Sequence, residues 1–193
     1  MAQSSQTISG QKTFKSAITV SEGATFTATG GVYKITAAST SLSNLAVRDL
    51  ITITGTTNNN ATFTVKSVDA NGTYITVEEI VVAEASDGST DTVLTYSGFV
   101  TDKYKGDGYY SQADGIHTVA YHVNATCTGA IKMQGSLATT PTEDDWFDIT
   151  GTTFTTDLST TINSVNFTGN FVWVRAKCTA NTAGSVTKIL YNN

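Results

Sequence analysis

The stretch DLITITGTTNNNATFTVKSVDANGTYITVEE, residues 49–79, decides the fold class of this chain. At its start, Ile51 and Ile53 alternate with threonines, which is the spacing of a β-strand with one buried face. Turn sequences rich in Asn and Gly follow at 55–60 and 71–72, and each leads into another segment of β-branched and aromatic residues. The stretch therefore predicts three consecutive antiparallel strands.

Composition extends this prediction to the whole chain. Only 14% of the 193 residues are charged and 39% are hydrophobic, while Thr, Ser, Asn and Gly take the place of the missing charge. There are 16 glycines and one proline, and the sequence has no long runs of Ala, Leu, Glu and Lys. We therefore expect an all-β protein whose turns are made by Gly, Asn and Asp.

Strand and turn signals divide the chain into four segments. We predict an N-terminal attachment or oligomerisation strand at 1–22, a small antiparallel β domain at 23–97, a linker at 98–115 and a C-terminal domain at 116–193. The small domain has about five or six strands, as a barrel or sandwich. The C-terminal domain has about six to eight strands, as an antiparallel β-sandwich. The linker is assigned because it mixes Lys, Asp, Gly and Tyr with no clear period.

Charge and hydropathy exclude some partners. The formal net charge is −5 and no basic patch is visible, which argues against a nucleic-acid partner. No apolar run reaches transmembrane length, and no signal peptide opens the chain. We therefore expect no membrane insertion, and synthesis as a soluble cytosolic product.

The sequence offers little for catalysis or metal binding. His117 and His122 lie five residues apart in one predicted strand, so they point to opposite faces and cannot share a metal or form a dyad. Cys127 and Cys178 lie in phase with apolar neighbours, and no CxxC or His/Cys cluster surrounds them. We interpret them as small buried core residues, with a disulfide as the alternative. Because familiar catalytic motifs are missing, we predict no catalytic residue, no metal site and no cofactor.

An acidic loop surrounds Trp146. Its carboxylates are those of Glu143, Asp144, Asp145 and Asp148. Such a cluster is compatible with Ca²⁺, or with the paired acids of a glycosidase. The EF-hand ligand pattern is missing, so we interpret the segment as a solvated loop that Trp146 or Phe147 anchors to the core.

Aromatic side chains are candidate contacts for a glycan or a protein partner. They are Tyr109, Tyr110, Trp146 and Trp173. Trp173 is out of phase with Val174, so it faces the other side of its strand, together with Arg175. One hypothesis is that these rings stack on sugars. The other is that the two Trp residues cap a small core or lie at a subunit contact, since interfaces are rich in Trp, Tyr and Arg.

Several stretches resemble bacteriophage virion proteins. QTISGQKTF followed by KSAITV, residues 6–20, resembles a short element of tail-fibre and related proteins in which "TI-x-G-x-KTF" precedes an "ITV"-like strand. The stretch 49–79 resembles a small β module of phage structural proteins. IKMQGSLATTPTEDDWFDI (131–149) and GNFVWVRAKCTANTAGSVTKILYNN (169–193) are similar to a terminal β-sandwich domain of phages with marine and cyanobacterial hosts. Together these stretches cover nearly half of the chain.

This resemblance implies a non-enzymatic virion structural protein, as a fibre, a tail or baseplate attachment, or a capsid decoration. Such proteins are commonly trimers, so it implies a homo-oligomer in the virion, with capsid or tail proteins as partners. The QTISGQKTF element occurs once in this chain, whereas it recurs in long fibres, and this argues against a long fibrous shaft. The alternative function is a glycan-binding module that recognises the host surface through exposed aromatic residues.

The N-terminal strand is predicted to form a contact with another protein chain. Its apolar residues fall on even positions, and no hairpin sequence folds the segment back on itself. A lone strand satisfies neither its backbone hydrogen bonds nor its apolar face. We therefore predict that its partner is another copy of the chain or the surface on which the chain docks. The predicted interface residues are Ile8, Phe14, Ile18 and Val20.

Overall fold

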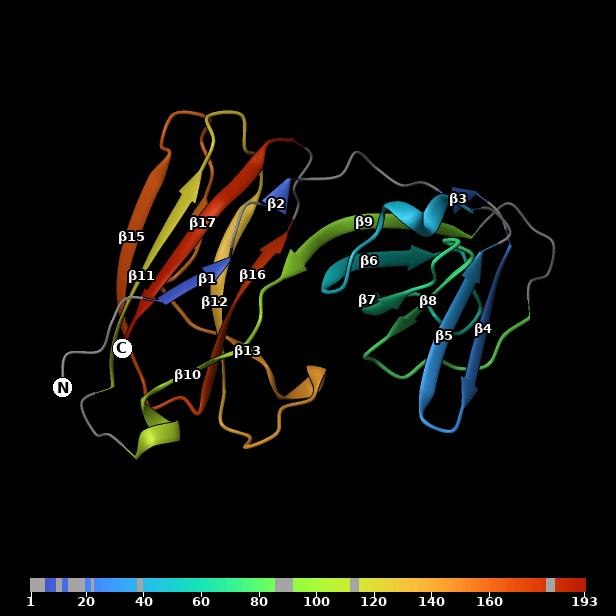
Figure 1. Cartoon of the computed structure of the whole chain (residues 1–193), viewed down its shortest axis with the longest axis horizontal. Helices are drawn as coiled ribbons and strands as arrows, with labels where there is room; N and C mark the ends of the chain where they lie inside the picture. The colour runs from blue at the N-terminus through green and yellow to red at the C-terminus, as the bar shows by residue number, and fades with distance from the viewer. Residues whose placement is uncertain are drawn as a thin grey trace. The chain divides into compact units, whose positions relative to one another are not determined.

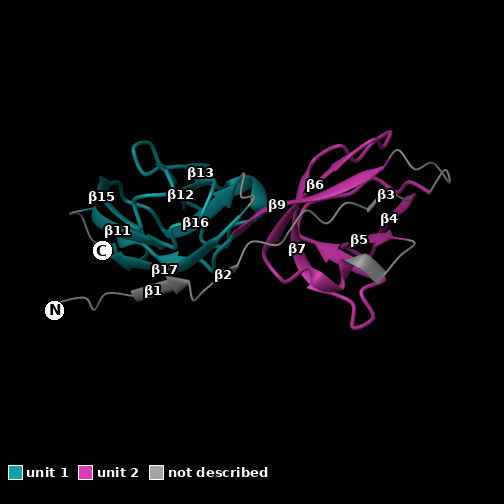
Figure 2. Cartoon of the chain, turned by 90° about the horizontal axis from the view of Figure 1, so that it is seen from above, with its two compact units in different colours: residues 1–14, 100–193 teal, residues 15–99 magenta. Residues whose placement is uncertain are grey.

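The computed structural model of the chain describes residues 6–9, 12–13, 20–21, 23–37, 40–85, 92–111, 115–179 and 183–193. The chain forms two compact units, shown in Figures 1 and 2. Unit 1 consists of residues 1–14 and 100–193, and unit 2 of residues 15–99. Antiparallel strands build both units, and the helices of the described residues are short 3-10 turns. The all-β prediction is confirmed.

Unit 2 contains the stretch that decided the fold class. Its strands are β3 (Val20–Ser21), β4 (Ala24–Thr29), β5 (Val32–Ala37), β6 (Asp49–Thr54), β7 (Thr62–Val68), β8 (Tyr74–Val77) and β9 (Val93–Val100), which ends where unit 1 begins. They follow the order β9-β6-β7-β8-β5-β4, and β3 pairs with β9. The three strands predicted within 49–79 are β6, β7 and β8, and each pairs antiparallel with the next along the chain.

Two devices hold the turns of unit 2. Gly72 lies between β7 and β8 with φ at +67°, and a Cβ there would lie 2.6 Å from the backbone nitrogen of Ser43, so only glycine fits. The Asn-rich turn is held by the carboxylate of Glu84, which accepts hydrogen bonds from the backbone N–H of Thr57 at 2.8 Å and from the side chain of Asn59 at 2.8 Å. The alternating apolar residues of the strands then meet in one core. It includes Phe26, Ile35, Ile51, Ile53, Phe63, Val65, Ile75, Val77 and Leu94.

Unit 1 is a sandwich of two antiparallel sheets. One sheet has the order β1-β17-β11-β15, with β2 also paired to β17. In the other, β12 pairs with β13, β14 and β16, and β16 pairs with β10. The strands are β1 (Gln6–Ser9), β2 (Lys12–Thr13), β10 (Tyr104–Lys105), β11 (Ile116–Val123), β12 (Ala130–Ser136), β13 (Phe147–Asp148), β14 (Phe154–Thr155), β15 (Ile162–Thr168), β16 (Trp173–Thr179) and β17 (Ser185–Asn192).

The core of unit 1 lies between these two sheets. Alternate residues of the strands are buried, and they include Val119, Tyr121, Ile131, Met133, Val174, Ala176, Ile189 and Tyr191. Tyr121 donates a hydrogen bond to the carbonyl of Thr152 at 2.8 Å, and burial raises the pKa of its phenol. Cys127 and Cys178 are buried thiols and do not form a disulfide.

Within the segment 98–115, predicted as a linker, residues 100–111 contribute structure to unit 1. They contain β10 and the 3-10 helix η2 (Asp107–Tyr110). The backbone N–H of Gly106 donates to Val172 at 3.0 Å, and that of Gly108 donates to Phe171 at 2.9 Å. Both close approaches need glycine, because a Cβ at either position would lie under 3.0 Å from the carbonyl oxygen of Phe171. Because this segment is held by backbone hydrogen bonds and close glycine contacts, its sequence shows no periodic pattern of hydrophobic residues, and we predicted it as a linker.

The N-terminal segment pairs with later strands of the same chain through its backbone. Thr7 lies opposite Leu190 of β17, and Val20 lies opposite Leu94 of β9. In the described part of the chain β1 is the outermost strand of its sheet, so its other edge has no strand beside it. Of the four predicted interface residues, Phe14 and Ile18 lie outside the described residues, and the side chains of Ile8 and Val20 are also outside them.

Within the described residues, no helix has the length and apolar character needed to cross a membrane.

Candidate functional site

The acidic loop is held by hydrogen bonds to protein groups. Its 3-10 helix η3 (Glu143–Asp145) begins with a capping box, in which Asp145 accepts from the backbone N–H of Thr142 at 2.7 Å and from its hydroxyl at 2.8 Å. These hydrogen bonds lower the pKa of the Asp145 carboxyl. Asp148 accepts from Gln134 at 2.9 Å and also pairs with Lys132. The described residues contain no cluster of three or more metal-ligating side chains.

Glu143 forms a bidentate pair with Arg175. Two nitrogens of the guanidinium donate to the two carboxylate oxygens of Glu143, each at 2.7 Å, and Nε donates to Gln134 at 2.9 Å. Arg175 is only 3% exposed, although it lies on a strand face that the sequence predicted to be outward. The indole of Trp146 lies over the guanidinium, 4.3 Å from its central carbon to the ring centroid. Trp146 thus covers the buried guanidinium of this ion pair, whose carboxylate is half-buried.

The other three candidate aromatics lie together. The ring of Trp173 is 5.1 Å from that of Tyr109, and Tyr109 is 5.3 Å from Tyr110, both in edge-to-face geometry. The indole N–H of Trp173 donates to the carbonyl of Thr139 at 3.0 Å, which fixes the orientation of the ring. Tyr109 and Tyr110 are 44% and 46% exposed, so solvent reaches the cluster.

Two lysines complete this cluster. The ammonium of Lys103 lies 4.7 Å from the ring centroid of Trp173, and that of Lys105 lies 4.0 Å from Tyr109 and 5.7 Å from Tyr110. We name this set, Lys103, Lys105, Tyr109, Tyr110 and Trp173, the aromatic patch. Sequence reasoning missed both lysines, because they lie in the segment predicted as a linker. Alternation of apolar and polar residues along β10 could have indicated which side chains face outward, but a strand of two residues is too short to show such a pattern.

Phe171 positions the patch. Besides Gly106 and Gly108, which bring η2 close to its backbone, Gly135 and Gly169 leave room for its ring. A Cβ on Gly135 would lie 2.6 Å from a ring carbon of Phe171, and one on Gly169 would lie 2.2 Å from another. Phe171 is itself buried, so four glycines pack around one anchor two residues before Trp173.

The imidazole of His117 is a buried polar group that contacts Gly169, two residues before Phe171. His117 is fully buried, with Nε2 2.7 Å from the carbonyl of Gly169 and Nδ1 2.8 Å from the hydroxyl of Tyr191. Burial raises the pKa of Tyr191, and the charge of Asp107 raises it further. The carboxylate of Asp107 is buried and has no hydrogen-bond partner among the described residues. His122 lies on the opposite face of β11, as predicted, and the buried ring of His117 is not accessible to a ligand from solvent.

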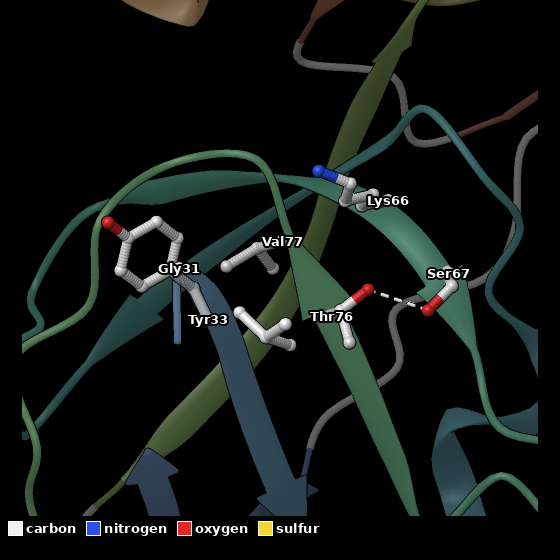
Figure 3. Close-up of a pocket in the computed structure, with 7 residues that line it drawn as sticks. Gly31, Tyr33, Lys66, Ser67, Thr76 and Val77 are labelled. Carbon is white, nitrogen blue, oxygen red and sulfur yellow. Dashed lines mark hydrogen bonds between the residues drawn. The ribbon is translucent and has the colours of Figure 1, made fainter. Parts of the chain in front are cut away.

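Unit 2 has a pocket of about 390 Å³ on strands β5, β7 and β8, shown in Figure 3. Its lining includes Tyr33, Lys66, Ser67 and Thr76. The hydroxyls of Ser67 and Thr76 bond to each other at 2.6 Å, and Lys66 pairs with Glu78 at 3.2 Å. Because these polar groups already have partners, the pocket presents less binding chemistry than the aromatic patch.

No protein-family model matches the chain, and no curated protein matches it at a significant level.

Proposed function

We propose that the chain is a non-enzymatic structural protein of a bacteriophage virion that assembles as a homo-oligomer, a trimer, on the particle. It serves as a fibre, a tail or baseplate attachment, or a capsid decoration. The proposal is supported by the resemblance of residues 6–20, 49–79 and the C-terminal stretches to such proteins. Two antiparallel β units, rich in Thr and poor in charge, are consistent with this mechanical role.

The observation that carries the proposal is the position of β1. This strand belongs to the fibre-like element QTISGQKTF, and it is the outermost strand of its sheet in the described residues. An outermost strand presents a row of backbone N–H and C=O groups that a strand from another chain can pair with. We propose that Ile8, Phe14, Ile18 and Val20 bury their side chains against another copy or against a capsid or tail protein.

The mass of the full chain in solution tests this proposal. We expect a trimer by native mass spectrometry, because three interfaces of one kind close a ring. In the double variant Ile8→Asp, Phe14→Asp we expect a monomer, since two carboxylates cannot be buried unpaired in an apolar contact. The matched control Thr7→Asp, Thr13→Asp adds the same charge at odd positions and keeps the trimer. Circular dichroism checks that all variants are folded, and a wild-type chain that is monomeric at every concentration contradicts the proposal.

A second function, recognition of a host-surface glycan, is supported by the aromatic patch. Three exposed or half-exposed rings gather at one end of unit 1, and aromatic faces suit the apolar faces of sugars. A symmetric particle would multiply a weak single-site affinity through its copy number. The test is a glycan array probed with the full chain displayed on beads at high density. If no glycan binds at that valency, glycan recognition is rejected and only the structural role remains proposed.

A further inference from the structure

We infer that the aromatic patch binds an acidic saccharide, whose carboxylate groups pair with Lys103 and Lys105 while the sugar ring contacts Trp173 and Tyr109. This inference rests on the proposed glycan recognition and specifies the chemical class of the ligand. It follows from three features of the patch: the charge of the two lysines, the rigidity of its rings and the placement of each ammonium group.

Lys103 and Lys105 have no carboxylate partner among the described residues. Neither Lys103 nor Lys105 forms an ion pair with a described residue, and both ammonium groups lie over aromatic rings. By contrast, Arg175, Lys132 and Lys66 each pair with a carboxylate. In a chain with a net charge of −5, two unpaired cations on neighbouring rings form a local site for an anion.

The rings of the patch are positioned before any ligand arrives. Trp173 is fixed by its hydrogen bond to Thr139, and η2, which carries Tyr109 and Tyr110, is held by backbone hydrogen bonds to Phe171 and Val172. The lysine side chains are in turn held over these rings. A preorganised site loses less conformational entropy on binding, so a small ligand is sufficient to occupy it.

The placement of the ammonium groups distinguishes acidic from neutral sugars. A neutral sugar that stacks on the ring face beneath an ammonium group of Lys103 or Lys105 displaces that cation and gives it no new partner. An acidic sugar brings a carboxylate to the same cation, whose ammonium group has three N–H donors with which to bind it. The geometry therefore favours the acidic ligand.

A nucleic acid also combines negative charge with stacking bases. Nucleic-acid sites generally use a longer row of cations, because affinity grows with the number of phosphates neutralised. The patch has two lysines, and the net charge of the chain repels an extended polyanion. These observations favour a short acidic saccharide, and an oligonucleotide enters the test as a competitor.

The experiment titrates the ¹⁵N-labelled full chain with an α-1,4-linked galacturonate trimer, and separately with the carboxyl-reduced form of the same trimer. The chain has two tryptophans, so two indole N–H signals report on Trp146 and Trp173 separately. We expect the trimer to shift the Trp173 signal more than the Trp146 signal. The neutral form should bind at least about tenfold more weakly, because it lacks both ion pairs. Raising the salt concentration should weaken binding of the acidic form.

Matched variants locate the binding charge. Lys103→Gln and Lys105→Gln should each weaken binding about threefold, and together about tenfold, without loss of the folded spectrum. The control Lys188→Gln removes the same charge from an exposed position in β17 and should leave the affinity unchanged. Equal affinity for the acidic and the neutral trimer, or an equal loss of affinity in the Lys188→Gln control, would contradict the inference of an acidic ligand.

The outcomes separate this inference from the functions on which it rests. Binding of the neutral trimer as tightly as the acidic one rejects the charge argument and keeps glycan recognition. Binding of neither trimer at millimolar concentration rejects the inference, and a negative glycan array then rejects glycan recognition as well. If a ten-nucleotide oligothymidylate binds more tightly than the galacturonate trimer, the inference of a saccharide ligand is rejected in favour of a nucleic acid. Native mass spectrometry of the chain tests the proposed homo-oligomer independently of these binding experiments.

Discussion

The two units differ in how they use the solvent-facing sides of their strands. In unit 2 neighbouring strands join hydroxyl to hydroxyl, as Thr52 does with Thr62 at 3.0 Å and Ser67 with Thr76 at 2.6 Å. In unit 1 the corresponding surface carries the bidentate pair of Arg175 with Glu143 beneath an indole, and Trp173 of the aromatic patch lies on the same strand as Arg175. Hydroxyl pairs stabilise a sheet without charge and present little to a ligand. This difference is the basis for our proposal that unit 2 acts as a scaffold and that unit 1 carries the groups that recognise a ligand.

The largest difference between the units should appear when a cation is removed from each. Arg175→Met leaves the half-buried carboxylate of Glu143 without its partner and removes the cation beneath Trp146, so we expect a loss of about 2 kcal/mol in the free energy of unfolding of unit 1. Lys66→Met in unit 2 removes an exposed pair with Glu78 and should change stability by about 0.5 kcal/mol or less. Urea unfolding of both variants measures the two effects, and equal losses would contradict the contrast.

Packing around Phe171 should give the next largest effect. Gly135→Ala places a methyl group against the Phe171 ring, and overpacking of this kind costs about 2 kcal/mol. In unit 2, Gly31 has φ at +77° and open space around its Cβ position, so Gly31→Ala carries backbone strain alone, about 1 kcal/mol. A double-mutant cycle of Gly135→Ala with Phe171→Leu checks the cause, because the smaller side chain should recover part of the loss. Strictly additive effects would rule out the proposed clash.

Acid should weaken unit 1 through Asp148. Burial alone raises the pKa of this carboxyl, but hydrogen bonds from Lys132 and Gln134 outweigh it and hold the pKa below its ordinary value. A carboxyl whose folded pKa is depressed contributes stability above its unfolded pKa, near 3.8, and loses it as the pH falls further. Asp148→Asn should therefore be less stable than wild type at pH 7 and similar to it near pH 2. A constant difference across this range, measured by thermal unfolding, would argue against the linkage.

The smallest expected effect concerns the thiols, which occur only in unit 1. Burial raises the pKa of Cys127 to about 11, so little thiolate is present at pH 8. We expect a disulfide reagent to react with the native chain far more slowly than with the urea-unfolded chain. Because the folded pKa is raised, this group's contribution to stability is complete below about pH 9 and is lost as the pH rises towards about 11. A native rate equal to the unfolded rate at pH 8 would show that Cys127 is exposed.

Local patterns in the sequence predicted the parts of the fold that local patterns control. The alternation in 49–79 gave three strands and their turns, and the phase of Trp173 against Val174 gave its outward position. The pairing of β1 with β17 joins opposite ends of the chain, and no local signal encodes such a partner. Lys103 and Lys105 were missed for a related reason, since their place in the site depends on glycine contacts to Phe171. The burial of Arg175 depends on Glu143, which is distant in sequence.

Hydrogen exchange measured by mass spectrometry tests assembly through the N-terminal segment most directly. The full chain is compared at a high concentration, which favours the proposed oligomer, and at a low concentration, which favours single chains. We predict that added protection of backbone amides concentrates in peptides that cover residues 1–22, because this segment forms the contact between copies. Added protection that spares residues 1–22 and falls elsewhere in the chain, or no added protection at all, would contradict the account.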